Sequence, residues 1–237
     1  MSANAAENVF RRIYDSSWHH PGVAFAGVFA FVLALARTQR FVVALSVIFA
    51  FEAAADALVT GGFSPTRGTS IHNALGIAFV ILGDLRYFAF ATHASRAANR
   101  LERRGLGDLS SWGLACALAM IVPVASTAPQ LIAPKFFTDE TRIYLLYEVM
   151  FVVLALLVRA LFLPRRLAVA STDIRVWIYR LTMFEIAQYG LWILSDVLIL
   201  SGVEFARVLR LVPNALYYAG FLPLAFFAAP ARLRDAP

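Results

Sequence analysis

Seven long apolar segments occupy most of the 237-residue chain, and they restrict its fold more than any other feature. A helix needs about 20 mostly apolar residues to cross the hydrocarbon core of a bilayer. The segments that meet this requirement are 18–37, 41–61, 70–93, 111–133, 142–164, 176–201 and 206–229. Hydrophobic residues make up 60% of the chain, and the 15% that are charged gather between these segments. The sequence therefore predicts an all-α, polytopic membrane protein with seven transmembrane helices.

The same segments predict one membrane domain and leave no room for a second, soluble domain. We expect a polar lead-in over residues 1–17, a single seven-helix domain over 18–229 and a tail over 230–237. Cys116 is the only cysteine and lies inside the fourth apolar segment, so the sequence indicates no disulfide framework.

The net charge of +6 predicts membrane orientation rather than nucleic-acid binding, because the basic residues lie in short loops. The side that follows segments one, three and five, together with the tail, carries Arg37, Arg40, Arg96, Arg100, Arg103, Arg104, Arg165, Arg166, Arg175, Arg232 and Arg234. The opposite side carries Arg11, Arg12, Arg67, Lys135, Arg142 and Arg207. Since cytoplasmic loops hold the excess of Lys and Arg, we expect an inner-membrane protein with its N-terminus outside and its C-terminus in the cytoplasm.

Six carboxylates lie inside the apolar segments, where a charged group that faces lipid costs several kcal/mol. They are Glu52, Asp56, Asp84, Glu148, Glu185 and Asp196. In the sixth segment, helical periodicity places Glu185, Tyr189, Trp192 and Asp196 on one stripe. We expect these acids to turn inward. We also expect Arg86 to pair with an acid on a neighbouring helix and Arg210 to neutralise one or two acids.

Two short sequence matches predict an internal repeat between the two ends of the chain, with chance similarity of apolar segments as the alternative. Residues 51–58 and 184–191 share the pattern Phe-Glu-x-Ala-x-x-x-Leu, and Asn73-Ala-Leu matches Asn214-Ala-Leu. The matches occur in the same order in both halves. They predict that segments one to three and five to seven are parallel copies, with segment four as the linker in a 3+1+3 arrangement. This repeat would bring Glu52 and Glu185 face to face.

The layout resembles the seven-helix, 3+1+3 group that contains the SWEET-type sugar carriers and, more distantly, the opsins. The resemblance to SWEET-type carriers implies a solute site at Asn73 and Asn214. Those carriers have hinge prolines in helices one, two, five and six, whereas the matching segments here have none in their interiors. A retinal Schiff base needs a lysine in the seventh helix, and the only lysine is Lys135, in a loop. We therefore expect no cofactor.

Buried acids of this kind suit proton transfer, and three functions use it differently. We expect a proton-coupled carrier of a small solute, with Glu52 and Glu185 handling protons. The first alternative is an intramembrane enzyme, similar to terpene cyclases, in which Glu185 or Asp196 protonates a lipid or isoprenoid. The second is a sensor or assembly subunit that acts through a partner. The acids would equally suit a structural network of hydrogen bonds between helices.

The candidate site residues fall into two groups. The proton-transfer candidates are Glu52, Glu185 and Asp196. The ligand-binding candidates are Asn73, Asn214, Asp56, Asp84, Glu148, Tyr189, Trp192, Arg210 and Tyr217. A divalent-cation site at Asp56, Glu148 and Asp196 is a weaker alternative, and we expect no metal. The expected partners are membrane lipid and a small-molecule or lipid ligand, and the sequence leaves open a homo-oligomer or a membrane protein partner.

Overall fold

The computed structural model describes residues 3–14, 29, 41–60, 64–66, 69–99 and 109–234, and every regular element in these ranges is a helix. Within these ranges, five helical stretches are long and apolar enough to cross a membrane: Val42–Thr60, Ser70–Ala94, Leu109–Ile132, Glu140–Arg166 and Thr172–Leu200. An all-helical fold with several membrane-length helices is therefore confirmed. The count of seven spans, the repeat, the orientation and the choice of membrane stay predictions. The first expected span, 18–37, lies outside the described residues apart from Phe29.

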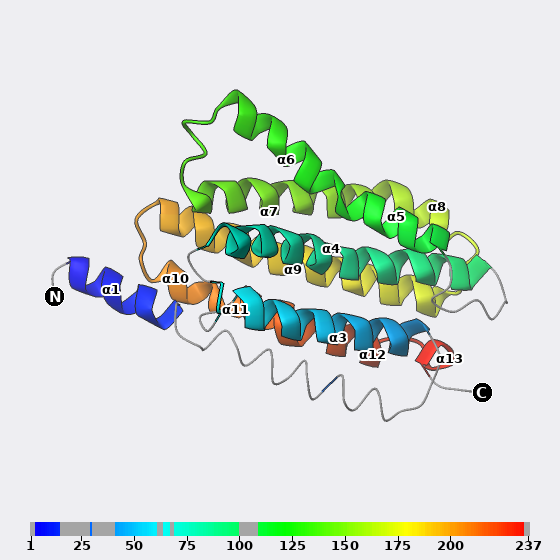
Figure 1. Cartoon of the computed structure of the whole chain (residues 1–237). Coiled ribbons are helices and arrows are strands. Elements are labelled where there is room, and N and C mark those ends of the chain that lie inside the picture. Colours follow the sequence, from blue (N-terminus) through cyan, green and yellow to red (C-terminus); the bar gives the residue numbers. More distant parts are fainter. Residues whose placement is uncertain are drawn as a thin grey trace.

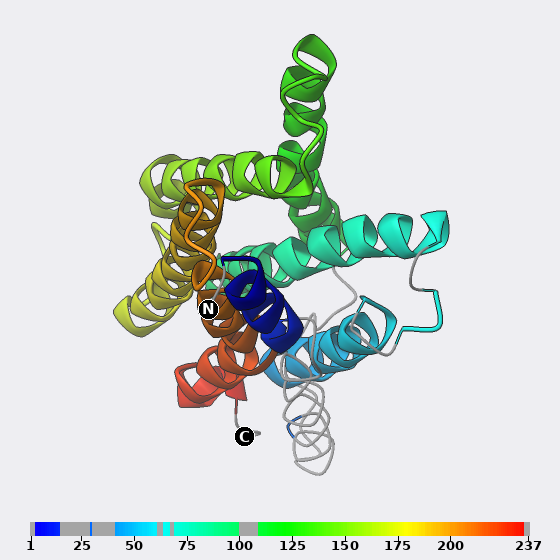
Figure 2. The same ribbon diagram turned by 90° about the vertical axis from the view of Figure 1, so that its left-hand side faces the viewer.

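Two long helices, α4 (Ser70–Asn99) and α9 (Thr172–Leu200), lie side by side in the middle of the bundle (Figure 1). Helix α3 (Phe41–Thr60) packs against α4, and α7 (Glu140–Leu157) packs against α9. The end-on view in Figure 2 shows α3 and α7 on opposite sides of this central pair. Side chains that point from α4 and α9 toward each other are therefore shielded from lipid.

The fourth expected span is two helices, α5 (Leu109–Ala119) and α6 (Ile121–Ile132). Helix α5 packs along α4, whereas α6 leans away from the bundle at one end (Figure 1). The short helix α1 (Ala3–Tyr14) lies beside the start of the last expected span, where Phe10 meets Phe205 edge to face at 5.8 Å.

The last expected span, 206–229, is a series of four short helices instead of one continuous helix. They are α10 (Ala206–Leu209), α11 (Leu211–Ala215), the π-helical turn η3 (Leu216–Gly220) and α12 (Phe221–Phe227). Pro213 and Pro223 lie within this series, and each lacks the N–H that a continuous helix needs. A second π-helical turn, η2 (Val158–Phe162), joins α7 to α8 (Leu163–Arg166). After α12, the short helix α13 (Ala231–Arg234) is the last described element.

Large apolar side chains cover the outside of the bundle. Phe51 is 65% exposed, Ile77 63% and Leu131 79%, and they belong to three of the membrane-length stretches. Large apolar side chains exposed on several helices are unfavourable against water, whereas lipid tails accept them without cost.

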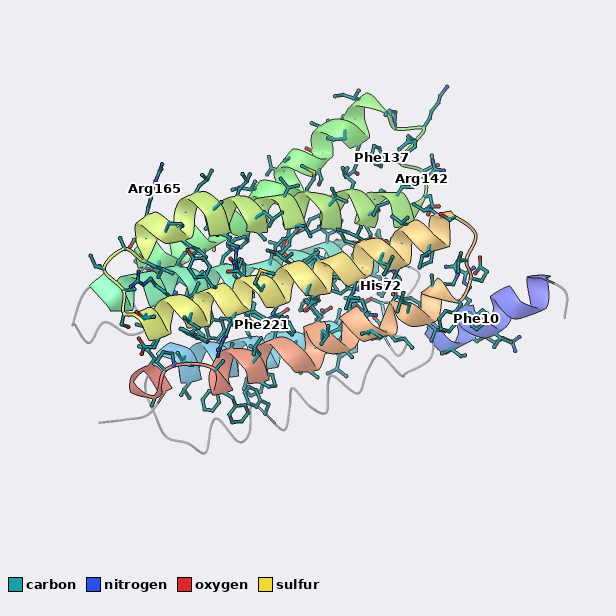
Figure 3. All side chains as sticks on the ribbon, turned by 180° about the vertical axis from the view of Figure 1, so that it is seen from behind. Phe10, His72, Phe137, Arg142, Arg165 and Phe221 are labelled. Atoms are coloured by element: carbon teal, nitrogen blue, oxygen red, sulfur yellow. The ribbon has the colours of Figure 1, made fainter. Side chains whose placement is uncertain are left out.

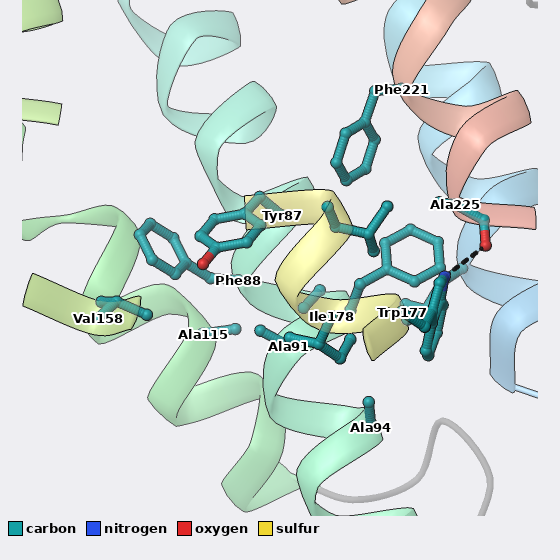
Figure 4. Packing of buried hydrophobic residues seen from close by; sticks show 14 of the residues in the cluster. Tyr87, Phe88, Ala91, Ala94, Ala115, Val158, Trp177, Ile178, Phe221 and Ala225 are labelled. Atoms are coloured by element: carbon teal, nitrogen blue, oxygen red, sulfur yellow. Dashed lines mark hydrogen bonds between the residues drawn. The ribbon is translucent and has the colours of Figure 1, made fainter. Parts of the chain in front are cut away.

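Aromatic side chains and alanines fill the centre, where α4, α9 and α12 converge (Figure 4). Trp177 packs edge to face on Phe90 at 6.1 Å, and its indole N–H donates to the carbonyl of Ala225 at 3.0 Å. Tyr87 and Thr182 share a hydrogen bond of 2.9 Å between their hydroxyl oxygens. These contacts fix the rotation of α4 and α9 about their axes, and that rotation decides which polar side chains meet.

Candidate functional site

Arg86 lies at the centre of the candidate site. Its side chain is 2% exposed, and it forms an ion pair with Glu52 on α3, with 3.0 Å between Nη2 and Oε2. Its Nη1 donates to the backbone carbonyl of Tyr217 at 2.8 Å, and its guanidinium carbon lies 4.4 Å from the centre of the Tyr217 ring. The prediction that Arg86 pairs with an acid on a neighbouring helix is confirmed.

The π-helical turn η3 makes the Tyr217 carbonyl accessible to Arg86. In an α-helix the N–H of Phe221 would donate to this carbonyl. In η3 the N–H of Phe221 donates one residue further back, to Leu216. The Tyr217 carbonyl therefore loses its usual donor, and Arg86 takes that place.

Glu185, on α9, lies in the same buried region but forms no ion pair with Arg86. It is 5% exposed and lies within Coulombic reach of both Arg86 and Asp84. Arg86 is thus under the influence of Glu52 and Glu185 together, and one oxygen of Glu52, Oε1, is buried without a hydrogen bond. Glu52 pairs with Arg86, whereas Glu185 influences Arg86 only electrostatically, so the face-to-face placement of the two glutamates stays a prediction.

Asp84 joins three helices through two tyrosine hydroxyls. Tyr147 on α7 donates to its Oδ2 at 2.6 Å, and Tyr189 on α9 donates to its Oδ1 at 2.5 Å. Asp84 is 1% exposed, so both of its oxygens obtain their partners from protein. Tyr147 was not among the expected site residues, because nothing in its spacing distinguishes it from the packing aromatics of α7.

Asp56 occupies the end of the site nearest Thr60. The Thr60 hydroxyl donates to Asp56 Oδ1 at 2.8 Å, and the hydroxyls of Tyr217 and Tyr218 interact electrostatically with the carboxylate, although the Tyr217 hydroxyl donates to the carbonyl of Phe79 at 3.3 Å. Thr60 and Tyr218 were not among the candidate site residues. The signal for Tyr218 was its place beside Tyr217 in an apolar segment, and the signal for Thr60 was its spacing of four residues from Asp56.

A row of aromatic rings connects these acids. Phe151 stacks on Tyr189 at 4.0 Å, Tyr189 meets Trp192 at 5.1 Å, and Trp192 meets Tyr217 at 5.9 Å between ring centres. The indole N–H of Trp192 donates to Asn214 Oδ1 at 2.8 Å. Three members of the α9 stripe, Tyr189, Trp192 and Asp196, therefore each have a different hydrogen-bond partner, and Glu185 interacts electrostatically with Arg86.

Asp196, the fourth member of the stripe, lies in a separate cluster. It pairs with Arg210, with 2.6 Å between Oδ1 and Nε and 2.8 Å between Oδ2 and Nη2. Glu148 lies within Coulombic reach of both, which fulfils the expectation that Arg210 neutralises acids. Eleven residues separate Asp196 from Glu185, about 16 Å along a helix, so Asp196 cannot act on the same small molecule atom as Glu185.

Two expected groupings remain: the pair Asn73 and Asn214, and the divalent-cation site. The side chain of Asn73 is outside the described residues, so its pairing with Asn214 stays a prediction. Asp56 lies with Tyr217 and Tyr218, whereas Asp196 pairs with Arg210, so the structure does not bring Asp56, Glu148 and Asp196 together. Within the described ranges, no group of three His, Cys, Asp or Glu side chains has the arrangement of a metal site.

Gly83 allows Tyr217 to approach α4, and its replacement tests how tightly the site is packed. A Cβ at Gly83 would lie 2.5 Å from the Tyr217 hydroxyl oxygen, whereas one at Gly76, on the same helix, would meet nothing within 4 Å. Gly83→Ala should displace the Tyr217 ring and cost about 1–3 kcal/mol. Gly76→Ala should be neutral or stabilising, because alanine favours a helix. Thermal unfolding in detergent measures both, and equal melting temperatures for the two variants would contradict the close packing.

The candidate site therefore combines side chains of α3, α4, α7 and α9 with the backbone of η3, around one buried arginine. Its residues include several titratable carboxyl groups and a row of aromatic rings. Comparison with protein-family models, with curated proteins and with solved structures gave no match for this chain.

Proposed function

We propose that the protein is a carrier that moves a small solute across the membrane together with protons. The observation that supports this most is the position of Arg86, which pairs with Glu52 on α3 and interacts electrostatically with Glu185 on α9. If a cation such as Arg86 pairs in turn with an acid on one helix and an acid on another, the helix bundle has two alternative arrangements. Alternating access requires such a change at a central site.

The balance of charge in the site favours proton coupling. Glu52, Asp56, Asp84 and Glu185 all lie within Coulombic reach of Arg86. One guanidinium cannot balance four buried carboxylates, and uncompensated charge in a low-dielectric interior is very costly. Protons or a cationic solute must therefore supply the balance, and exchange of one for the other is the basis of coupled transport.

The interrupted helices favour movement. Transporter sites commonly lie where a membrane helix is broken, because broken backbone can line a cavity and can bend. Here the turn η3 contributes a backbone carbonyl directly to Arg86, and η2 interrupts the stretch Glu140–Arg166. These π-helical turns replace the hinge prolines of SWEET-type carriers as places where a helix can change direction.

Proteoliposomes test the proposal. Transport currents are recorded on a solid-supported membrane after the concentration of an amine, a sugar or a carboxylic acid is raised abruptly. A current should appear for one class of solute, and its size should change with pH. Glu52→Gln and Glu185→Gln should each reduce this current at least about tenfold, since each removes a proton-exchanging group. Glu204→Gln is the matched control, because Glu204 pairs with Arg207 near the surface. Full currents in both site variants would show that the proposal is wrong.

A second candidate, an intramembrane enzyme that protonates a lipid or isoprenoid, is favoured by the row of rings from Phe151 to Tyr217 beside Glu185 and Asp84. Aromatic faces stabilise carbocations as they stabilise other cations. Incubation with prenyl lipids and product analysis distinguishes this candidate from a carrier. A product that depends on Glu185, in the absence of solute-driven current, would replace the carrier by the enzyme.

A further inference from the structure

An open groove lies on the outside of the bundle, away from the candidate site. It has a volume of about 720 Å³ and lies between η2, α9 and α12. Its lining residues are Arg159, Val176, Tyr179, Arg180, Met183, Phe184, Ala187 and Leu224. The lining is apolar except for two arginines and the hydroxyl of one tyrosine, and it contains no acid.

The two arginines have unused donors. Nη1 of Arg159 is buried without a hydrogen-bond partner, and the Arg159 guanidinium carbon lies 5.1 Å from the centre of the Tyr179 ring. Arg180 is exposed on α9. Neither forms an ion pair with a carboxylate of the described part of the chain. A buried guanidinium N–H without a partner is costly, so an anionic acceptor at this place would be bound favourably.

The distance of the two arginines from the helix ends suits contact with a lipid phosphate. Arg180 is eight residues from the first residue of α9 and Arg159 is seven from the last residue of α8, about 10–12 Å along each helix. Both helix ends meet at residues 167–171, at the end of the bundle that carries Arg165 and opposite the end that carries Arg142 (Figure 3). Long arginine side chains extend toward the membrane surface from this depth. Met183, Phe184 and Ala187 lie further along α9, where acyl chains would lie.

We propose that this groove binds one anionic phospholipid. The phosphate lies between Arg159 and Arg180, and an acyl chain follows Met183, Phe184, Ala187 and Leu224. A lipid with a net negative headgroup balances the two guanidinium groups better than a zwitterionic lipid, whose ammonium group opposes them. This binding site is independent of the proposed transport function, because none of its lining residues contributes a polar group to the Arg86 site.

Native mass spectrometry of the purified full chain in detergent tests the proposal. Phosphatidylglycerol and phosphatidylcholine with identical acyl chains are added in equal amounts. The wild type should retain one phosphatidylglycerol at least about tenfold more tightly than phosphatidylcholine, given the strength of charge-assisted hydrogen bonds. The double variant R159Q/R180Q should lose this preference. A wild type that retains both lipids equally would overturn the proposal.

Two controls separate a built site from general surface charge. R165Q/R166Q removes the same charge from the same end of the bundle, outside the groove, and should retain the preference. Equal losses in both double variants would mean that surface charge alone attracts the lipid, which overturns the site. If R159Q/R180Q fails to fold, Ala187→Phe fills the groove from an exposed position and leaves both arginines intact. Undiminished phosphatidylglycerol binding by Ala187→Phe would also overturn the site.

The last arm addresses the acyl chain. Glycerophosphoglycerol, which is the headgroup without acyl chains, should not displace bound phosphatidylglycerol, because the apolar lining supplies much of the binding. Displacement at equal concentration would show that the phosphate alone determines binding and that the groove is not a lipid site.

Discussion

Arg86→Met should destabilise the protein by about 3–5 kcal/mol, which is the usual cost of removing one partner from a buried ion pair. Glu52 would remain buried without its cation, and the Tyr217 carbonyl would lose its donor. Reversible unfolding in mixed detergent micelles, followed by far-ultraviolet circular dichroism, measures the change in free energy of unfolding. Arg86→Lys should fall between the wild type and Arg86→Met, because an ammonium group cannot reach both acceptors with the planar geometry of a guanidinium.

A double-mutant cycle shows whether the loss arises from the pair. Glu52→Gln combined with Arg86→Met removes both charges, so the double variant should be more stable than the sum of the two single losses predicts. The coupling should amount to at least about 1 kcal/mol, as found for residues in one ion-pair network. Additive losses would mean that Glu52 and Arg86 do not depend on each other in the folded protein.

Asp84→Leu should cost about 2–6 kcal/mol, because it leaves the hydroxyls of Tyr147 and Tyr189 without acceptors, at about 1–3 kcal/mol for each buried group. The triple variant D84L/Y147F/Y189F removes the polar atoms together and should recover much of the stability. Asp84→Asn should be intermediate, since its amide oxygen still accepts from one hydroxyl. The same unfolding measurement applies.

The comparison of the triple variant with Asp84→Leu decides the interpretation. If the triple variant is less stable than Asp84→Leu, the tyrosine hydroxyls have other acceptors, and Asp84 is not what holds α7 and α9 to α4. Tyr179→Phe serves as a control for loss of a tyrosine hydroxyl on α9, because Tyr179 lies in the outer groove and not at Asp84.

The inward orientation of the acids was predictable from sequence because it follows from a local rule. A carboxylate in a bilayer-length helix must avoid lipid whatever its neighbours are, so spacing alone placed Glu185 and Tyr189 on one buried stripe. The same rule predicted that Arg86 pairs with an acid of another helix. Length and hydropathy likewise predicted the helical membrane architecture, since both depend only on the segments themselves.

The choice of partners was not predictable, because it depends on the rotation and depth of each helix in the packed bundle. Glu185 and Asp196 share a stripe, yet one lies near Arg86 and the other pairs with Arg210, about three turns away. Tyr147 binds an acid that only tertiary packing brings to it, whereas Thr60 binds Asp56 from one turn further along the same helix. The π-helical turns were also missed, since a one-residue change in hydrogen bonding leaves no mark in apolar periodicity.

The contact between Arg86 and the Tyr217 carbonyl has a consequence for mutagenesis. The acceptor belongs to the peptide unit, so every side-chain replacement at position 217 retains it, and an alanine scan would overlook an essential ligand of the guanidinium. Within this segment, only an insertion or a deletion would alter the hydrogen bond that this carbonyl accepts. Deleting one residue between Leu216 and Gly220 would restore α-helical hydrogen bonding in this segment. The Tyr217 carbonyl would then accept from a backbone N–H of its own helix and not from Arg86.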